Sequence, residues 1–132
     1  MNYHGTIIEE SLKDTSVLKE IHILSTKVDA VTERHKTPWL TQWTLHKVEV
    51  PEKDAARIAE KLSKAIDDTH EGSWYADYKT EDDHFIIFKN KVFHITDRTN
   101  KAQYDEAKNY GISLGIPEYQ VDFHPEVKEW KQ

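Results

Sequence analysis

Residues 73–96 constrain the fold more than any other stretch, because they hold three runs typical of β-strands separated by two short polar turns. The first run, WYADY, alternates large aromatic residues with smaller or charged ones. The second, HFIIF, is apolar on both faces, as in a central strand that is buried on two sides. The third is VFHI, and the turns TEDD and KNK contain residues that tolerate tight-turn conformations. We therefore predict an antiparallel meander at the centre of the core.

A long helix is predicted just before this meander, from Pro51 to about residue 68. Proline is favoured in the first turn of a helix, and the acids Glu52 and Asp54 offset the helix dipole there. The following apolar residues recur at helical spacing and predict one face packed on the sheet. They are Ala55, Ile58, Ala59, Leu62, Ala65 and Ile66.

The remaining segments complete an α+β pattern. Residues 3–10 are predicted to form a strand at the sheet edge, because this run is short and ends in acids. Asp14 or Thr15 is expected to cap a short helix that buries Val17 and Leu18. Residues 21–31 and 39–50 are predicted strands joined by a polar loop, and Asn100 is expected to cap a last helix with Gln103 as its capping-box partner.

Together these elements predict one α+β domain over residues 1–124, followed by a C-terminal tail at residues 125–132. We expect an antiparallel sheet of about five to six strands, with the two main helices packed on one face.

Composition narrows the functional classes. The chain has no cysteine, which excludes disulfides, thiolate zinc sites and cysteine nucleophiles. Its net charge of −6 argues against binding to nucleic acid or to an anionic membrane surface. No apolar run approaches the roughly 18 residues of a membrane span, and no secretory signal is evident at the N-terminus. We expect a cytoplasmic protein without a cofactor.

Four segments are distinctive: WLTQWTLHKVEVP, WYADYK, HFIIFKNKVFHI and YGISLGIPEYQVDF. They resemble a set of small uncharacterised bacterial proteins that have no assigned activity. The resemblance spans roughly residues 3–123 and implies one complete domain, and it implies no catalytic or binding residues.

Histidine is the unusual component of the sequence, with eight copies. None has the close spacing of a helical metal motif. Strand residues His22, His46 and His94, with Asp77 or Glu49, could form a zinc or iron site if they converged. Nothing in the spacing enforces convergence, so we expect strand histidines to be packing or surface residues and predict no metal site.

The pattern H-x-T occurs at His4, His35 and His94. Two such motifs on facing strands resemble the signature of the two-histidine phosphoesterases, in which one histidine acts as base and one as acid while hydroxyls hold a phosphate. The chain is short for that duplicated fold, and Gly5 interrupts the first motif. If the protein is an enzyme, the expected catalytic residues are His4, His46, His94 and Thr96.

The aromatic residues suggest a binding surface beside a basic loop, where an exposed patch would mark a ligand groove or protein interface. The alternative is that these aromatics form the core. We expect a noncatalytic ligand- or protein-binding module that forms a homodimer through its sheet or edge strands. The alternatives are a small histidine-dependent hydrolase, either phosphoesterase-like or metal-dependent, and a phage- or defence-related inhibitor. The predicted ligand-binding residues are Arg34, His35, Lys36, Trp39, Trp43, Trp74 and Tyr78.

Overall fold

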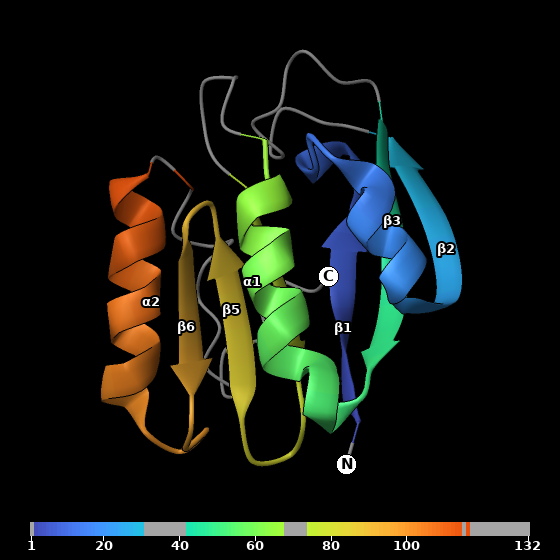
Figure 1. The fold of residues 1–132 in the computed structure, drawn as a ribbon. Coiled ribbons are helices and arrows are strands. Elements are labelled where there is room, and N and C mark those ends of the chain that lie inside the picture. The colour runs from blue at the N-terminus through green and yellow to red at the C-terminus, as the bar shows by residue number, and fades with distance from the viewer. Residues whose placement is uncertain (1, 31–41, 68–73, 115, 117–132) are drawn as a thin grey trace.

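The protein folds around one antiparallel sheet of six strands, in the order β2-β3-β1-β4-β5-β6 (Figure 1). The computed structural model describes residues 2–30, 42–67, 74–114 and 116. The prediction of an α+β domain with an antiparallel sheet is confirmed. The strands are β1 (Tyr3–Ile8), β2 (His22–Ala30), β3 (Gln42–Val50), β4 (Tyr75–Lys79), β5 (His84–Phe88) and β6 (Lys91–Ile95).

The predicted meander is confirmed as β4, β5 and β6. All five residues of β5 are buried, as expected for a strand covered on both faces. The turn between β5 and β6 contains Asn90 with a φ of 60°, a left-handed conformation that asparagine tolerates.

The prediction that the first strand lies at the edge is wrong. Strand β1 lies inside the sheet, between β3 and β4, and its Ile7 is fully buried. The acids that suggested an edge, Glu9 and Glu10, belong to the 3₁₀ turn η1 (Glu9–Ser11). Glu10 accepts hydrogen bonds from the backbone and hydroxyl of Thr44, so it has a structural partner.

The helical predictions are largely confirmed. Helix α1 (Ala55–Ala65) follows the 3₁₀ turn η4 (Glu52–Asp54), and its predicted apolar stripe is buried. The short helix is the 3₁₀ segment η2 (Thr15–Glu20), which Asp14 caps. Helix α2 (Lys101–Ser113) is capped by Asn100, but no capping box forms. The side-chain oxygen of Gln103 instead accepts from the amides of Thr96 and Asp97.

The prediction that both helices pack on one face is wrong. Side chains alternate across a strand, and β5 sends Phe85 and Ile87 into the cluster that contains α1. Its Ile86 and Phe88 join Tyr104 of α2 on the opposite face. In Figure 1, α1 crosses the front of the sheet, whereas α2 lies at the left edge beside β6. Helix α2 packs only at the end of the sheet that holds β5 and β6, so the described helices leave most of the face opposite α1 uncovered.

Among the described residues, every helix is too short or too polar to cross a bilayer.

Candidate functional site

The expected aromatic surface does not form at the three of its residues that lie in the described part of the chain. Trp43, Trp74 and Tyr78 are 3%, 5% and 0% exposed, so they belong to the core, as the alternative interpretation held. The two tryptophan rings lie 5.2 Å apart between centroids. The Tyr78 hydroxyl donates to the carbonyl of Ala55. The other four predicted binding residues (Arg34, His35, Lys36 and Trp39) lie outside the described residues, and their role stays a prediction.

The described strand histidines do not converge. His46 lies 3.1 Å from Glu9 through Nε2 and 2.9 Å from the Thr26 hydroxyl through Nδ1. His94 Nε2 lies 2.7 Å from Asp83, and His22 lies 3.8 Å from Glu49. Within the described part of the chain, no group of three or more histidines and acids is arranged to hold a metal ion. The convergence considered for these three histidines is therefore absent.

The two H-x-T copies on strands also lie apart, on opposite faces of the sheet. His4 is opposite Lys79, whereas His94 is opposite Phe85 on the face that α1 covers. Strands β4 and β5 separate the two motifs. The Thr96 hydroxyl accepts a hydrogen bond from the side chain of Gln103. The alternative site considered from the resemblance to two-histidine phosphoesterases is therefore not assembled from these residues.

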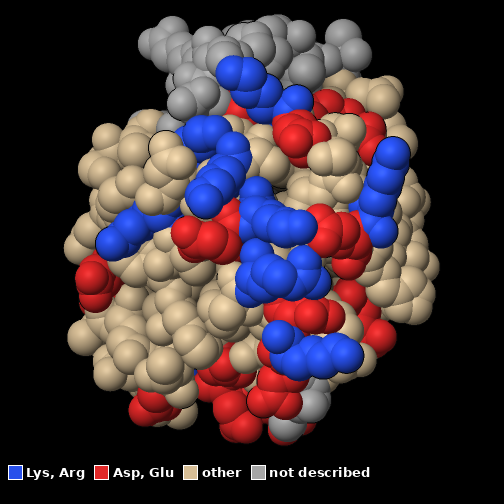
Figure 2. Space-filling view, in the orientation of Figure 1, with Lys and Arg blue, Asp and Glu red and all other residues tan. Residues whose placement is uncertain are grey.

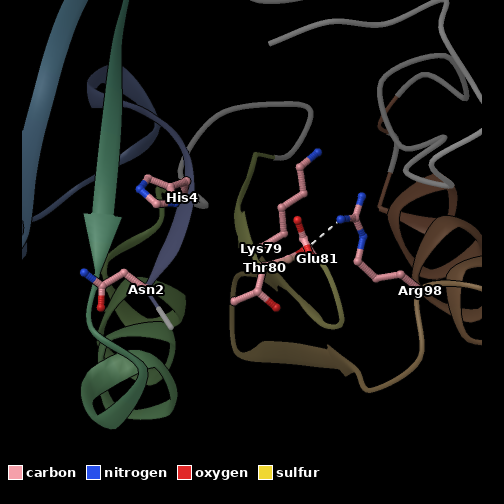
Figure 3. Close-up of a pocket in the computed structure, with 6 residues that line it drawn as sticks. All are labelled: Asn2, His4, Lys79, Thr80, Glu81 and Arg98. Atoms are coloured by element: carbon pink, nitrogen blue, oxygen red, sulfur yellow. Dashed lines mark hydrogen bonds between the residues drawn. The ribbon is translucent and has the colours of Figure 1, made fainter.

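The face opposite α1 instead carries one continuous row of side chains, because the registers of neighbouring strands align them. The row runs from β2 to β6 as His22, Glu49, His4, Lys79, His84 and Ile95. Near its middle lies an open hollow of about 560 Å³ (Figure 3). The hollow is lined by Asn2, His4, Lys79, Thr80, Glu81 and Arg98.

Strand β1 supplies one wall of the hollow. His4 Nε2 lies 2.8 Å from Glu49 Oε2, and this hydrogen bond lowers the pKa of the Glu49 carboxyl. A hydrogen bond from the side chain of Asn2 lowers the same pKa further. Glu49 is therefore an ionised acceptor that orients His4 and Asn2.

The end of β4 and the segment before α2 supply the other wall. The exposed Lys79 and the half-buried Arg98 extend in the same direction in Figure 3. Arg98 Nη1 donates to the carbonyl of Thr80 at 2.8 Å, and its Nε donates to the Tyr104 hydroxyl at 3.2 Å. Among the described residues, no carboxylate forms an ion pair with either cation.

A buried hydrogen-bond chain continues from Arg98 into the core. The Tyr104 hydroxyl lies 3.1 Å from His84 Nδ1, and His84 Nε2 lies 2.7 Å from Asp77 Oδ2. With the His84 proton on Nε2, each link has one donor and one acceptor, from the Arg98 cation to the Asp77 carboxylate. Burial raises the pKa of the Tyr104 hydroxyl, and the hydrogen bond from Arg98 offsets part of that effect. The phenol thus stays neutral and holds the guanidinium in place.

A second polar cluster lies on the α1 face, at the other side of the β4–β5 turn. Asp83 accepts from the hydroxyls of Tyr3 and Thr80 and from His94, whose ring stacks on Phe85 at 4.1 Å between centroids. Burial alone raises the pKa of Asp83, but these hydrogen bonds outweigh burial and lower it. This cluster fixes the turn that presents Thr80 and Glu81 to the hollow.

Sequence reasoning found His4 but missed the residues opposite it. Lys79, Arg98 and Tyr104 come from separate elements, and they carry no motif that links them. The pairing of β1 with β4 places Lys79 opposite His4. Because this pairing is a contact between distant segments, no local sequence pattern indicates it.

Comparisons of the chain with protein-family models, curated proteins and solved structures gave no match. The resemblance to small bacterial proteins of no assigned activity therefore stays a prediction.

Proposed function

We propose that the protein is a noncatalytic binding module that holds a small anionic ligand in the hollow beside Arg98. The observation that carries this proposal is the state of the Arg98 guanidinium. Its Nε and one Nη1 hydrogen are held by Tyr104 and Thr80, while the Nη2 hydrogens have no partner among the described residues. Guanidinium groups bind carboxylates and phosphates through such paired donors.

Preorganisation supports the same proposal. An arginine that is already fixed loses little side-chain entropy when a ligand binds, so more of the interaction energy contributes to affinity. Lys79 adds a second positive charge on the same wall, and Asn2 and Thr80 add neutral polar groups. A volume of about 560 Å³ suits a small organic anion rather than a macromolecule.

The noncatalytic assignment follows from the groups that are missing from this hollow among the described residues. His4 is the only histidine among the described residues that line it, and the Thr80 hydroxyl already donates to Asp83. A hydrolase of the two-histidine type needs a second histidine that can reach the substrate, and Glu81 does not supply it. The nearest histidine in the row, His84, is 1% exposed and bonded on both ring nitrogens.

The test is a titration with inorganic phosphate, followed by amide NMR shifts and calorimetry. We expect saturable shifts around Lys79, Thr80 and Arg98, and an affinity loss of about tenfold or more in Arg98→Gln, because a charge-assisted hydrogen bond contributes roughly 1.5–3 kcal/mol. Lys53→Gln is the matched control, since Lys53 is exposed in η4, on the α1 side. Absence of saturable shifts with phosphate and with citrate would refute the proposal, as would equal losses in both variants.

The same titration separates binding from the hydrolase alternative when phosphate monoesters are added. Binding predicts that the ester is bound and recovered intact. Release of phosphate that depends on His4 would replace the noncatalytic proposal with the hydrolase.

We further propose that the macromolecular partner is a second copy of the chain rather than nucleic acid or a membrane. On the face in Figure 2, lysine and arginine are intermixed with aspartate and glutamate, so no broad basic surface forms there. Nonspecific binding to phosphates needs clustered positive charge.

A further inference from the structure

The exposed edge of the sheet at β2 has the features of a pairing surface. Among the described strands, β2 is hydrogen-bonded to β3 alone, and it is nine residues long (Figure 1). Unpaired backbone groups along such an edge are a template for another strand. Leu24 and Val28 are 50% and 56% exposed, and they are two of the three large hydrophobic residues exposed in the described part of the chain.

Within the described part of the chain, the opposite edge of the sheet is protected by a short strand and a long helix, and β2 has neither feature. Strand β6 is only five residues long, and α2 packs beside it. Short edges and covering helices are the usual means of blocking strand addition. The difference between the two edges singles out β2.

The order of charges on β2 is self-complementary. If two copies pair antiparallel with Val28 opposite Val28, Lys27 of each copy lies opposite Asp29 of the other, and Thr26 lies opposite Ala30. Opposite charges facing each other across strands stabilise pairing, and like charges destabilise it. The β-bulge between Ile23 and Ser25 falls outside this paired span, so the ladder over residues 26–30 is regular.

We propose that the occupant of this edge is a second copy of the chain, paired through β2 about a twofold axis at Val28. The two sheets then form one continuous sheet, and side chains that point to one face in each copy point to the same face in the dimer. The Lys27 Nζ and Asp29 Oδ1 atoms lie 3.2 Å apart, on one face of the strand. The twofold axis therefore places two equivalent Lys27–Asp29 pairs across the interface. This inference is independent of the anion site, because it uses none of the residues that line the hollow.

The test is a charge swap read by light scattering and sedimentation at tens of micromolar protein. Wild type is expected at twice the chain mass of 15.5 kDa. Lys27→Asp alone and Asp29→Lys alone each place like charges opposite one another twice, so the dimer dissociation constant should rise about tenfold or more. The double variant K27D/D29K restores opposite charges and should restore the dimer.

Mixing the two single variants is the sharpest arm of the experiment. In the mixed pair every facing charge is again opposite, so the two weakened proteins should form a heterodimer. The control is Lys91→Asp on β6, which changes the same charge at the other edge and should leave the mass unchanged. A monomeric wild type would overturn the proposal, and so would single variants that stay dimeric. A double variant that is folded yet monomeric would overturn this register, and circular dichroism checks the folding of each variant.

Discussion

Replacing Gly5 by alanine should destabilise the protein strongly, although alanine is usually the better residue in a strand. Gly5 lies on β1 opposite Tyr78 of β4, where the two backbones come unusually close. A Cβ added at residue 5 would lie 1.9 Å from the carbonyl oxygen of Asp77 and 2.5 Å from Cα of Tyr78. Ordinary contact begins near 3.4 Å, and both obstacles are backbone atoms that cannot rotate away.

The magnitude follows from what must move. The β1–β4 ladder has three residue pairs, and a displacement of more than an ångström would break about two of its hydrogen bonds, at roughly 1 kcal/mol each. Loosened packing around the fully buried Tyr78 adds about 1–2 kcal/mol. The usual advantage of alanine over glycine within a strand returns only about 0.5–1 kcal/mol. We therefore expect a net loss of roughly 2–3 kcal/mol.

Urea and thermal unfolding of Gly5→Ala measure this loss directly. The expected fall in melting temperature is on the order of 10 °C for a domain of this size. Ser25→Ala on the exposed β2 is the control and should change stability by less than about 0.5 kcal/mol. Phosphate affinity should fall as well, because separation of β1 from β4 moves His4 away from Lys79. A Gly5→Ala protein as stable as wild type would show that the close approach does not constrain the sheet.

Three further outcomes follow from the polar network. Urea titrations should show that Asp83→Asn is less stable than wild type at pH 7. Because the folded pKa of Asp83 is lowered, this difference should be present above about pH 4 and should shrink as the pH falls through the folded pKa. Burial raises the pKa of the Tyr78 hydroxyl, so the stability that the neutral phenol contributes is complete below about pH 10 and declines at higher pH. Ultraviolet titration should show that this phenol ionises only when the protein unfolds. Tyr104→Phe should lower phosphate affinity in wild type but much less in an Arg98→Lys background, by calorimetry; equal losses in both would mean that Tyr104 does not act through Arg98.

The regular elements could be predicted because their signals are local. The stripe of α1 and the fully apolar β5 lie within short windows of sequence, where periodicity and turn residues determine the element. The caps at Asp14 and Asn100 are local as well, since each side chain bonds amides a few residues away. The predicted capping-box role of Gln103 was wrong because the partner of this side chain is not determined locally. Its side chain satisfies the backbone that leaves β6, and that choice depends on the path of the preceding loop.

The arrangement of elements could not be predicted, because it depends on contacts between distant segments. Nothing in the sequence near Thr6 indicates that this residue will lie opposite Asp77 of β4, about seventy residues further along the chain. That pairing puts β1 inside the sheet and His4 beside Lys79. The face of the sheet on which α2 packs depends on the direction of the loop before it. The periodicity of the sequence does not predict that direction. The aromatic residues were ambiguous because burial, and not residue type, separates a core tryptophan from a binding one.

The charge balance of the hollow supports an anionic ligand better than a cationic one. Two acids on this face are already engaged, since Glu49 accepts from His4 and Asp77 accepts from His84. Glu81 lines the hollow, yet among the described residues it forms no ion pair with Lys79 or Arg98. Two cations therefore face the hollow without an ion-pair partner among the described carboxylates, and Arg98 is fixed by a buried hydrogen-bond chain. A fixed positive charge with unused donors is stabilised most by an anion that brings its own acceptor oxygens.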